Sequence, residues 1–200
     1  MKQKFGKILI GIVIIVAVFG YAHIAKTHNV YDSDIDTSEY KDTNVCLNEE
    51  MAQTFICQEE HLDGVRVKSR IIGEAKNVEI DYSLTEKETN TQLVQGTIKG
   101  DQVKNGKFFE FPFDRIKSTR GKEYEFKIAE KGEDGENSVN FCYTVKQEKN
   151  TNMSLNGEEL EGTVVLRTVT NRFDLETFCV LLIFILYIIA FMRFLYKLFR

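Results

Sequence analysis

The regular alternation of apolar and polar residues in the middle of the chain is the feature that most constrains its fold. Residues 78–84, for example, place Val78, Ile80 and Tyr82 two positions apart between charged or polar neighbours. This period of two is typical of a strand with one buried and one wet face, and no amphipathic helix is evident in this region. The pattern predicts about eight strands, at residues 53–57, 65–68, 78–84, 93–98, 108–113, 124–128, 139–145 and 164–169.

Turn signals separate these segments. Asn156-Gly157 favours a two-residue hairpin of type I′, because both central residues of that turn need a positive φ. Pro112, the single proline of the chain, lies inside a strand pattern and cannot donate to a strand ladder, so we expect it at a sheet edge or a bulge. Short strands at this spacing predict an all-β fold, a jelly-roll-like β-sandwich.

Two apolar segments lie outside this pattern, one at each end of the chain. Residues 8–25 carry no charge and follow three lysines, which predicts an N-terminal transmembrane anchor. A cleaved signal peptide is the alternative, because Gly20-Tyr21-Ala22 has the form of a cleavage site. Residues 177–196 are apolar except for Arg193 near their end, and this length predicts a C-terminal transmembrane helix.

The charges beside the apolar segments predict an orientation. Lysines precede the first segment, and Arg193, Lys197 and Arg200 end the second, so the positive-inside rule places both termini in the cytoplasm of a cell-membrane protein. Residues 26–172 hold 20 Lys and Arg against 28 Asp and Glu, a net charge of −8. An acidic domain without a basic face argues against nucleic acid as a partner.

These features divide the chain into four parts. Residues 1–25 are the predicted anchor or signal peptide, and residues 26–44 are predicted to be a polar, acidic stalk. Residues 45–172 form the predicted extracytoplasmic β-sandwich, and residues 173–200 form a transmembrane helix with a short basic tail.

The cysteines show no metal-binding pattern. Cys46, Cys57 and Cys142 belong to the exported part, where an odd number leaves at least one unpaired within the chain. Their spacing fits no zinc motif, and their disulfide state stays open. Cys57 and Cys142 fall in strand patterns, where buried free thiols are expected.

Two acidic clusters have some features of calcium sites. In the first, Asp32, Asp34 and Asp36 have the spacing of calcium ligands, but an EF-hand loop needs Gly and Glu where Thr37 and Thr43 stand. We therefore expect a solvated acidic segment.

The second acidic cluster, Glu133, Asp134 and Glu136, lies in a glycine-rich turn. Solvation is again expected, with structural calcium as the alternative. No metal ligand is assigned from the sequence.

A catalytic site is not expected. His61 is the one histidine inside the predicted sandwich, and nothing near it has the form of a nucleophile elbow. The many carboxylates fall on wet strand faces and turns, and no glycine-rich phosphate loop is present. We assign no catalytic or cofactor-binding residue and expect a protein that is not an enzyme.

Several short motifs resemble one family of modules. They are Gln53-Thr-Phe, Leu62-Asp-Gly-Val65, Asp101-Gln-Val-Lys-Asn105 before Phe109-x-Phe-x-Phe113, Lys122-x-Tyr-x-Phe-x-Ile128, Asn137-x-Val and Leu155-Asn-Gly157. Over residues 45–170 the chain resembles the extracytoplasmic jelly-roll (galactose-binding-like) modules of Gram-positive membrane proteins of cell-surface polysaccharide assembly. The resemblance implies a cell-envelope setting and a binding or scaffolding role, and it carries over no catalytic residue.

Three functions follow as expectations. The first is a membrane-anchored, non-enzymatic module that binds a cell-surface glycan or a membrane protein of polysaccharide assembly, held near its partner by its helices. The second is a self-assembling structural envelope protein with a topology similar to that of polysaccharide co-polymerases. The third, with the least support, is an enzyme that acts on glycan.

Overall fold

The chain divides into two compact units in the computed structural model, which describes residues 2–43, 50–132, 134 and 136–199. One unit joins the two ends, Met1–Lys26 and Asn171–Arg200, and the other is the domain Thr27–Thr170.

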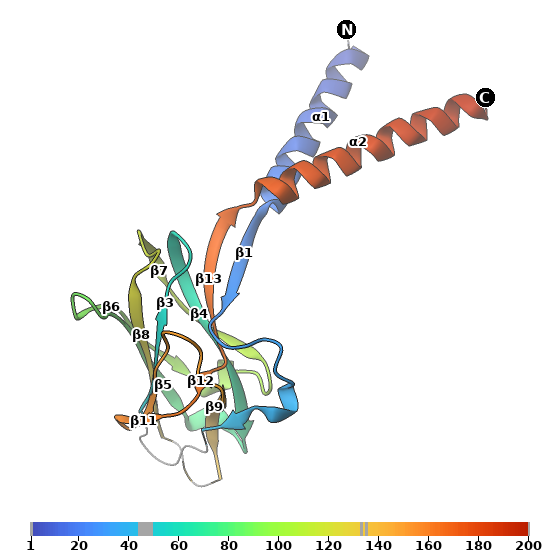
Figure 1. Cartoon of the computed structure of the whole chain (residues 1–200). Helices are drawn as coiled ribbons and strands as arrows, with labels where there is room; N and C mark the ends of the chain where they lie inside the picture. The colour runs from blue at the N-terminus through green and yellow to red at the C-terminus, as the bar shows by residue number, and fades with distance from the viewer. Residues whose placement is uncertain (1, 44–49, 133, 135, 200) are drawn as a thin grey trace. The chain divides into compact units, whose positions relative to one another are not determined.

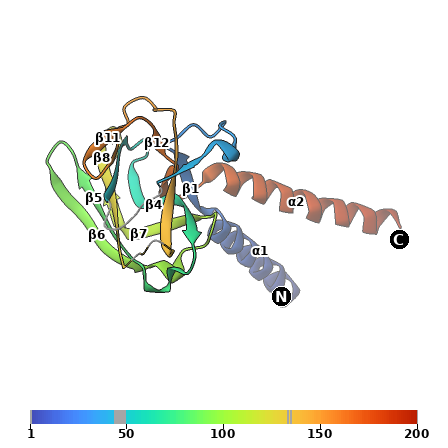
Figure 2. The same ribbon diagram turned by 90° about the horizontal axis from the view of Figure 1, so that it is seen from below.

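The domain is a β-sandwich of two antiparallel sheets (Figures 1 and 2). The seven-stranded sheet has the order β1 (His23–Asn29), β13 (Leu166–Phe173), β4 (His61–Ile72), β9 (Ser138–Thr144) and β12 (Thr163–Val164), with β2 (Lys41–Asp42) on β9 and β7 (Phe108–Lys117) on β4. The six-stranded sheet has the order β11 (Glu158–Leu160), β10 (Met153–Leu155), β3 (Glu50–Ile56), β8 (Glu123–Lys131), β5 (Glu79–Glu86) and β6 (Thr91–Lys99).

The predicted β-sandwich is therefore confirmed, but the prediction of about eight strands is too low. Each of the eight predicted segments lies in or overlaps a strand, and the described residues form thirteen. The additional strands are short or polar: β1 and β2 precede the predicted sandwich, and β10, β11 and β12 are two or three residues long. A period of two cannot be recognised in so few residues.

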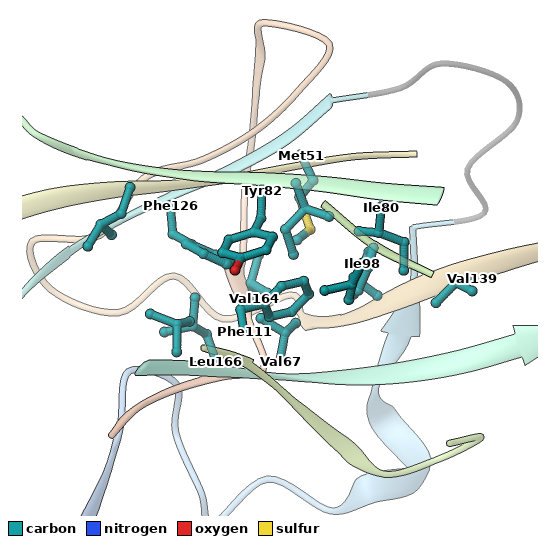
Figure 3. Packing of buried hydrophobic residues seen from close by; sticks show 14 of the residues in the cluster. Met51, Val67, Ile80, Tyr82, Ile98, Phe111, Phe126, Val139, Val164 and Leu166 are labelled. Carbon is teal, nitrogen blue, oxygen red and sulfur yellow. The ribbon is translucent and has the colours of Figure 1, made fainter. Parts of the chain in front are cut away.

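The core lies between the sheets and is built from the alternating residues. Phe111 of β7 is completely buried, and its ring centroid lies 5.2 Å from those of Tyr82 on β5 and Phe126 on β8 (Figure 3). Phe109 and Phe113 pack against the same cluster from positions two residues away. The odd-numbered phenylalanines of the run 108–113 therefore face the core.

The local signals for turns and edges are also confirmed. Asn156 and Gly157 have φ values of 54° and 80° and join β10 to β11, as a type I′ turn requires. Pro112 lies on β7, which pairs with β4 alone among the described strands, beside a register irregularity between Leu62 and Gly64. A residue without an N–H is tolerated at such an edge.

The segment predicted to be a stalk is instead part of the sandwich. The main chain of β2 pairs with β9, and Tyr31 forms a small second cluster with Cys142 and Val165. The Arg167 guanidinium lies 3.9 Å from the Phe108 ring centroid and donates to the Tyr31 hydroxyl at 3.0 Å. A polar composition hid this docking, because aromatic rings and a cation supply contacts that periodicity does not reveal.

The other unit holds two helices, α1 (Lys2–Tyr21) and α2 (Leu175–Leu198). Within the described residues, α2 is the one helix long and apolar enough to cross a membrane, with a mean hydropathy of 2.7. The apolar part of α1, Leu9–Tyr21, is shorter. The expectation that a helical span continues to residue 25 is wrong, because the helix ends at Tyr21 and a strand begins at His23.

Aromatic side chains join the helices where they meet the strands. The Phe19 ring lies 4.7 Å from that of His23 and 5.1 Å from that of Phe173. The N–H of Asp174 donates to the carbonyl of Ala22 at 2.8 Å. These contacts order the segments on which both helices end or begin.

Candidate functional site

A groove of about 550 Å³ is the largest concavity among those characterised in the domain. One wall is the segment His28–Tyr31, the second is the end of β3, and the third is the loop between β9 and β10. The lining residues are His28, Asn29, Val30, Tyr31, Phe55, Ile56, Gln58, Lys146, Gln147, Glu148, Lys149, Asn150 and Thr151. Residues 147–152 of the loop also border a second concavity of about 480 Å³.

Buried threonines hold this loop in place. The Thr163 hydroxyl donates to the carbonyl of Lys146 at 3.0 Å and accepts from the N–H of Glu148 at 2.9 Å. Thr151 donates to the carbonyl of Glu148 at 2.8 Å. Thr163 and Thr151 are buried, so these hydrogen bonds form away from competing water and fix the backbone of the loop.

The loop is also bonded to the six-stranded sheet. The N–H of Asn152 donates to the Thr54 hydroxyl at 2.8 Å, and the N–H of Thr54 donates to the Asn152 carbonyl at the same distance. The Gln147 amide donates to the carbonyl of Thr151 at 2.8 Å and to Oδ1 of Asn152 at 3.0 Å. A loop bonded at so many points presents its exposed side chains in a fixed arrangement, which lowers the entropy lost on binding.

An ion pair joins the loop to the opposite wall of the groove. Nζ of Lys146 lies 2.5 Å from Oδ2 of Asp32 and 3.4 Å from a carboxylate oxygen of Glu148. The hydrogen bond from Lys146 lowers the pKa of Asp32, and the same bond raises the pKa of Lys146. Lys146 and Asp32 therefore stay charged at neutral pH and hold the loop beside the N-terminal segment.

The lining is rich in carboxamides. Asn29, Gln58 and Asn150 each carry an acceptor oxygen and a donor NH₂ group. Gln147 adds an acceptor oxygen, because its NH₂ group is bonded within the loop, and Ile56 adds an apolar surface that is 39% exposed. Asn150 has a φ of 58°, a left-handed conformation that Asn tolerates better than most residues. This mixture suits a neutral, hydroxyl-rich ligand with apolar C–H faces.

The carboxylates that line the groove differ in number from those of a glycoside-hydrolysing site. Glu148 is the one carboxylate among the groove's described lining residues, and that carboxylate is ion-paired. Glycoside hydrolysis uses two carboxyl groups on either side of the bond.

The acidic triplet of the N-terminal segment does not converge on one point. Asp32 accepts from the N–H of Asp34 at 2.9 Å, and Asp36 accepts from the N–H of Ser38 at 2.8 Å, where it caps the short helix η1 (Thr37–Glu39). The carboxylates of Asp32 and Asp36 thus stabilise local turns. Among the described residues, no three Asp, Glu, His or Cys side chains are placed to share a metal ion.

The second acidic cluster is described in part, since Glu133 lies outside the described residues. Asp134 accepts from the N–H groups of Glu136 and Asn137, at 2.9 and 2.7 Å. The side-chain hydrogen bond from Asn137 is the main reason why the pKa of Asp134 is lowered. This carboxylate organises its own turn.

Cys57, Cys142 and His61 are not among the residues that line the groove. Cys57 and Cys142 are buried free thiols, as expected, and Cys46 lies outside the described residues. Burial raises the pKa of Cys142 to about 11. His61 lies on β4, where its carbonyl accepts from the Thr170 hydroxyl at 2.6 Å.

No role is assigned from the sequence to any groove residue, and residues 146–154 have only the polar composition of a loop. The useful signal was the carboxamide content of the loop, with Gln147, Asn150 and Asn152 within six residues. His28 and Asn29 were assigned to the stalk, so their position across the groove could not be foreseen.

Comparison with known proteins assigns the chain to no family. No family model and no curated protein matches it. Among solved structures, it is similar to a clostridial cysteine protease, Cwp84 after propeptide cleavage, with a TM-score of 0.45, 12% identity, and coverage of 74% of this chain and 40% of that one. A structure of the cysteine protease and lectin-like domains of Cwp84, a surface layer associated protein of Clostridium difficile, gives a TM-score of 0.44, 11% identity, and coverage of 74% and 36%.

A third similar structure is the infectious bursal virus derived T=1 particle, with a TM-score of 0.31, 10% identity, and coverage of 76% of this chain and 36% of that one. The chain spans less than half the length of each of these three proteins. The description of the fold therefore rests on the strand pairing of the chain itself.

Proposed function

We propose that the chain is a membrane-anchored, non-enzymatic binding module whose groove takes a cell-surface glycan. The observation that carries this proposal is the set of carboxamides on a loop fixed by buried hydrogen bonds. Carboxamides donate and accept at once, as hydroxyl groups do, and can therefore bond to two neighbouring hydroxyls of a sugar. Ile56, half-exposed in the same groove, would pack on the apolar face of the ring.

The setting that we propose is the cell envelope. In this proposal α2 spans the membrane, α1 enters it as anchor or signal, both termini are cytoplasmic, and Thr27–Thr170 lies outside. The proposal includes a sandwich of jelly-roll type, and the alternation of β3, β4 and β5 between the sheets supports it. The module would serve as an accessory to polysaccharide assembly, with its glycan held near a membrane protein of that machinery.

A matched pair of substitutions tests the groove. Asn150→Gly removes the carboxamide while keeping a residue that tolerates the φ of 58°. Asn90→Gly makes the same change at a φ of 50° in the turn between β5 and β6. The full-length protein, reconstituted in nanodiscs, would be applied to an array of bacterial surface glycans. We expect binding that Asn150→Gly weakens about five- to tenfold, the contribution of one hydrogen bond, and that Asn90→Gly preserves.

Two outcomes would contradict the glycan proposal. One is the absence of any array signal from the wild-type protein; the other is equal binding by both variants. In either case, capture of a membrane protein of polysaccharide assembly by the wild-type chain would favour the scaffolding role without the glycan. Protease digestion of sealed vesicles tests the orientation, since the domain should be cleaved only from the outer side.

A further inference from the structure

The edge strand β6 has little of the protection that usually prevents strands from associating: a bulge at Leu93 and the exposed Lys99 at its end. It ends the six-stranded sheet and pairs with β5 alone among the described strands. Its residues from Thr91 to Ile98 include no charge and no proline, and Leu93 is 41% exposed. Natural edge strands of this length are normally protected by charges, proline or very short length, because their free N–H and C=O groups can pair with another strand.

Two other edge strands, β7 and β11, are protected in these ways. On β7, Pro112 removes a donor and stands near the charged side chains of Asp114 and Arg115. The strand β11 is three residues long and begins with Glu158 and Glu159, both exposed. The contrast identifies β6 as the long neutral edge of the domain Thr27–Thr170, within its described residues.

A hollow of about 510 Å³ lies beside β6, where the two sheets separate. It is lined by Tyr82, Leu93, Val94 and Gln95 from the β6 side and by Pro112, Phe113 and Asp114 from β7. Val94 and Phe113 are half-buried there, since no further strand covers them in the described residues. The sandwich therefore leaves apolar side chains accessible beside free main-chain groups.

We propose that β6 pairs with β6 of a second copy of this chain, antiparallel about a two-fold axis at Gly96. This inference is independent of the glycan proposal. A register shift in the β5–β6 ladder leaves Leu93 without a Cα partner on β5, so the regular part of the strand is Val94–Lys99. Centring the pair on Gly96 places Val94 opposite Ile98 and Gln95 opposite Thr97. The first pair is then apolar and the second polar, as favourable cross-strand pairs require, and Lys99 falls opposite Leu93.

The charge pattern favours a second copy as the occupant. The full chain has a net charge of −4, so most surfaces of two copies repel one another. A neutral strand removes this repulsion where the copies meet. Two glycines face each other at the centre, so β6 itself carries no side chain there, and the Tyr82 ring of β5 lies against Gly96. Attachment to a membrane would add to the effect by confining the copies to one surface and raising their effective concentration.

Two charge-matched double substitutions test the interface. Gln92→Lys with Gln95→Lys adds four positive charges across the paired edge at exposed positions. Thr37→Lys with Ser38→Lys adds the same charge at exposed positions in η1. Light scattering of the full-length protein in detergent measures the mass of each. We expect a dimer for the wild type and for the η1 variant, and at least a tenfold weaker dimer for the β6 variant. A monomeric wild type, or a β6 variant that dimerises as well as the control, would overturn the proposal.

A cross-link keeps the proposal testable if the lysine variant fails to fold. Chains carrying Gln95→Cys are mixed with chains carrying Thr97→Cys, after Cys46 and Cys179 have been replaced by serine in both. The proposed register places these two positions directly opposite, within reach of a disulfide. We expect oxidation to link the mixture but neither chain alone. Links absent from the mixture, or equally abundant in each chain alone, would show that the register is wrong.

Discussion

The side-chain oxygen Oε1 of Gln53 on β3 accepts a hydrogen bond of 2.7 Å from the N–H of Val164 on β12, and thereby joins the two sheets. Gln53 is completely buried, and its amide nitrogen donates to the carbonyls of Thr54 and Asn152 at 2.9 and 3.1 Å. One polar side chain thus satisfies main-chain groups of both sheets and of the loop that forms the groove.

Replacing Gln53 should reveal the value of this connection. Gln53→Leu keeps the volume but leaves the N–H of Val164 and the carbonyl of Asn152 without this partner. We expect the free energy of unfolding to fall by about 2–4 kcal/mol, the cost of leaving buried polar groups unsatisfied. This free energy can be measured by unfolding the protein with urea in detergent and monitoring the transition by circular dichroism. The control Gln102→Leu, at an exposed site, should stay within about 0.5 kcal/mol of wild type; equal effects would show that Gln53 is dispensable.

Gly96 and Tyr82 predict a second, sterically caused loss of stability. A Cβ atom at position 96 would lie 2.5 Å from the Tyr82 ring, and that ring is held by the bond of its hydroxyl to the Pro112 carbonyl at 2.7 Å. We expect Gly96→Ala to cost about 1–3 kcal/mol. In a Tyr82→Leu background the same change should cost much less, since the clash is gone. If the double variant loses as much stability as the two single variants together, a clash with the Tyr82 ring is not the cause of the loss.

The free energy of unfolding should also fall in acid, because ion-paired carboxylates stabilise the fold only while they are ionised. Hydrogen bonds from Lys131 to Asp81 and from Lys122 to Glu86 lower the pKa values of both carboxyls below 3.8 and 4.5, their ordinary values. A lowered folded pKa contributes stability that is present above the ordinary value and is lost as the pH falls through the folded one. The free energy of unfolding should therefore be constant from about pH 5 to 7 and decline below about pH 4. Asp81→Asn should make this decline shallower, and an unchanged decline would exclude Asp81 as a contributor.

The buried thiol of Cys142 should resist alkylation. Because burial raises its pKa to about 11 from 9.0, the thiolate at pH 8 is about 100-fold less abundant than in the unfolded chain. Iodoacetamide labelling, read at each cysteine by peptide mass spectrometry, should therefore modify Cys142 slowly in the native protein and rapidly in urea. Rapid native labelling would mean that the strand pair β2–β9 opens readily.

How much of this structure the sequence could predict depends on how each part is encoded. Strands such as β5 have a buried and a wet face, so a period of two reveals them. The turn at Asn156-Gly157 is encoded locally as well. The docking of Tyr31 against Arg167 is not, because it joins residues 136 positions apart through an aromatic and cationic contact. Without it, residues 26–44 have the composition of a solvated stalk.

The groove was harder to predict for a related reason. Its walls come from the N-terminal segment, the end of β3 and the β9–β10 loop, which only the strand order brings together. The threonines that fix the loop, Thr151 and Thr163, are ordinary polar residues in the sequence. Their importance comes from burial, and nothing in their immediate neighbours indicates that they are buried.

The chain enters the domain at Thr27 and leaves it at Thr170, and the N–H of Val30 donates to the carbonyl of Leu166 at 3.0 Å. The two connections to the helices therefore run through neighbouring strands of one sheet. If the helices were pulled apart, the tension would reach this hydrogen bond before the core, and the strands would separate one bond at a time. Such peeling needs far less force than sliding two paired strands past each other, so the first mechanical event would be release of the N-terminal segment and, with it, of one wall of the groove.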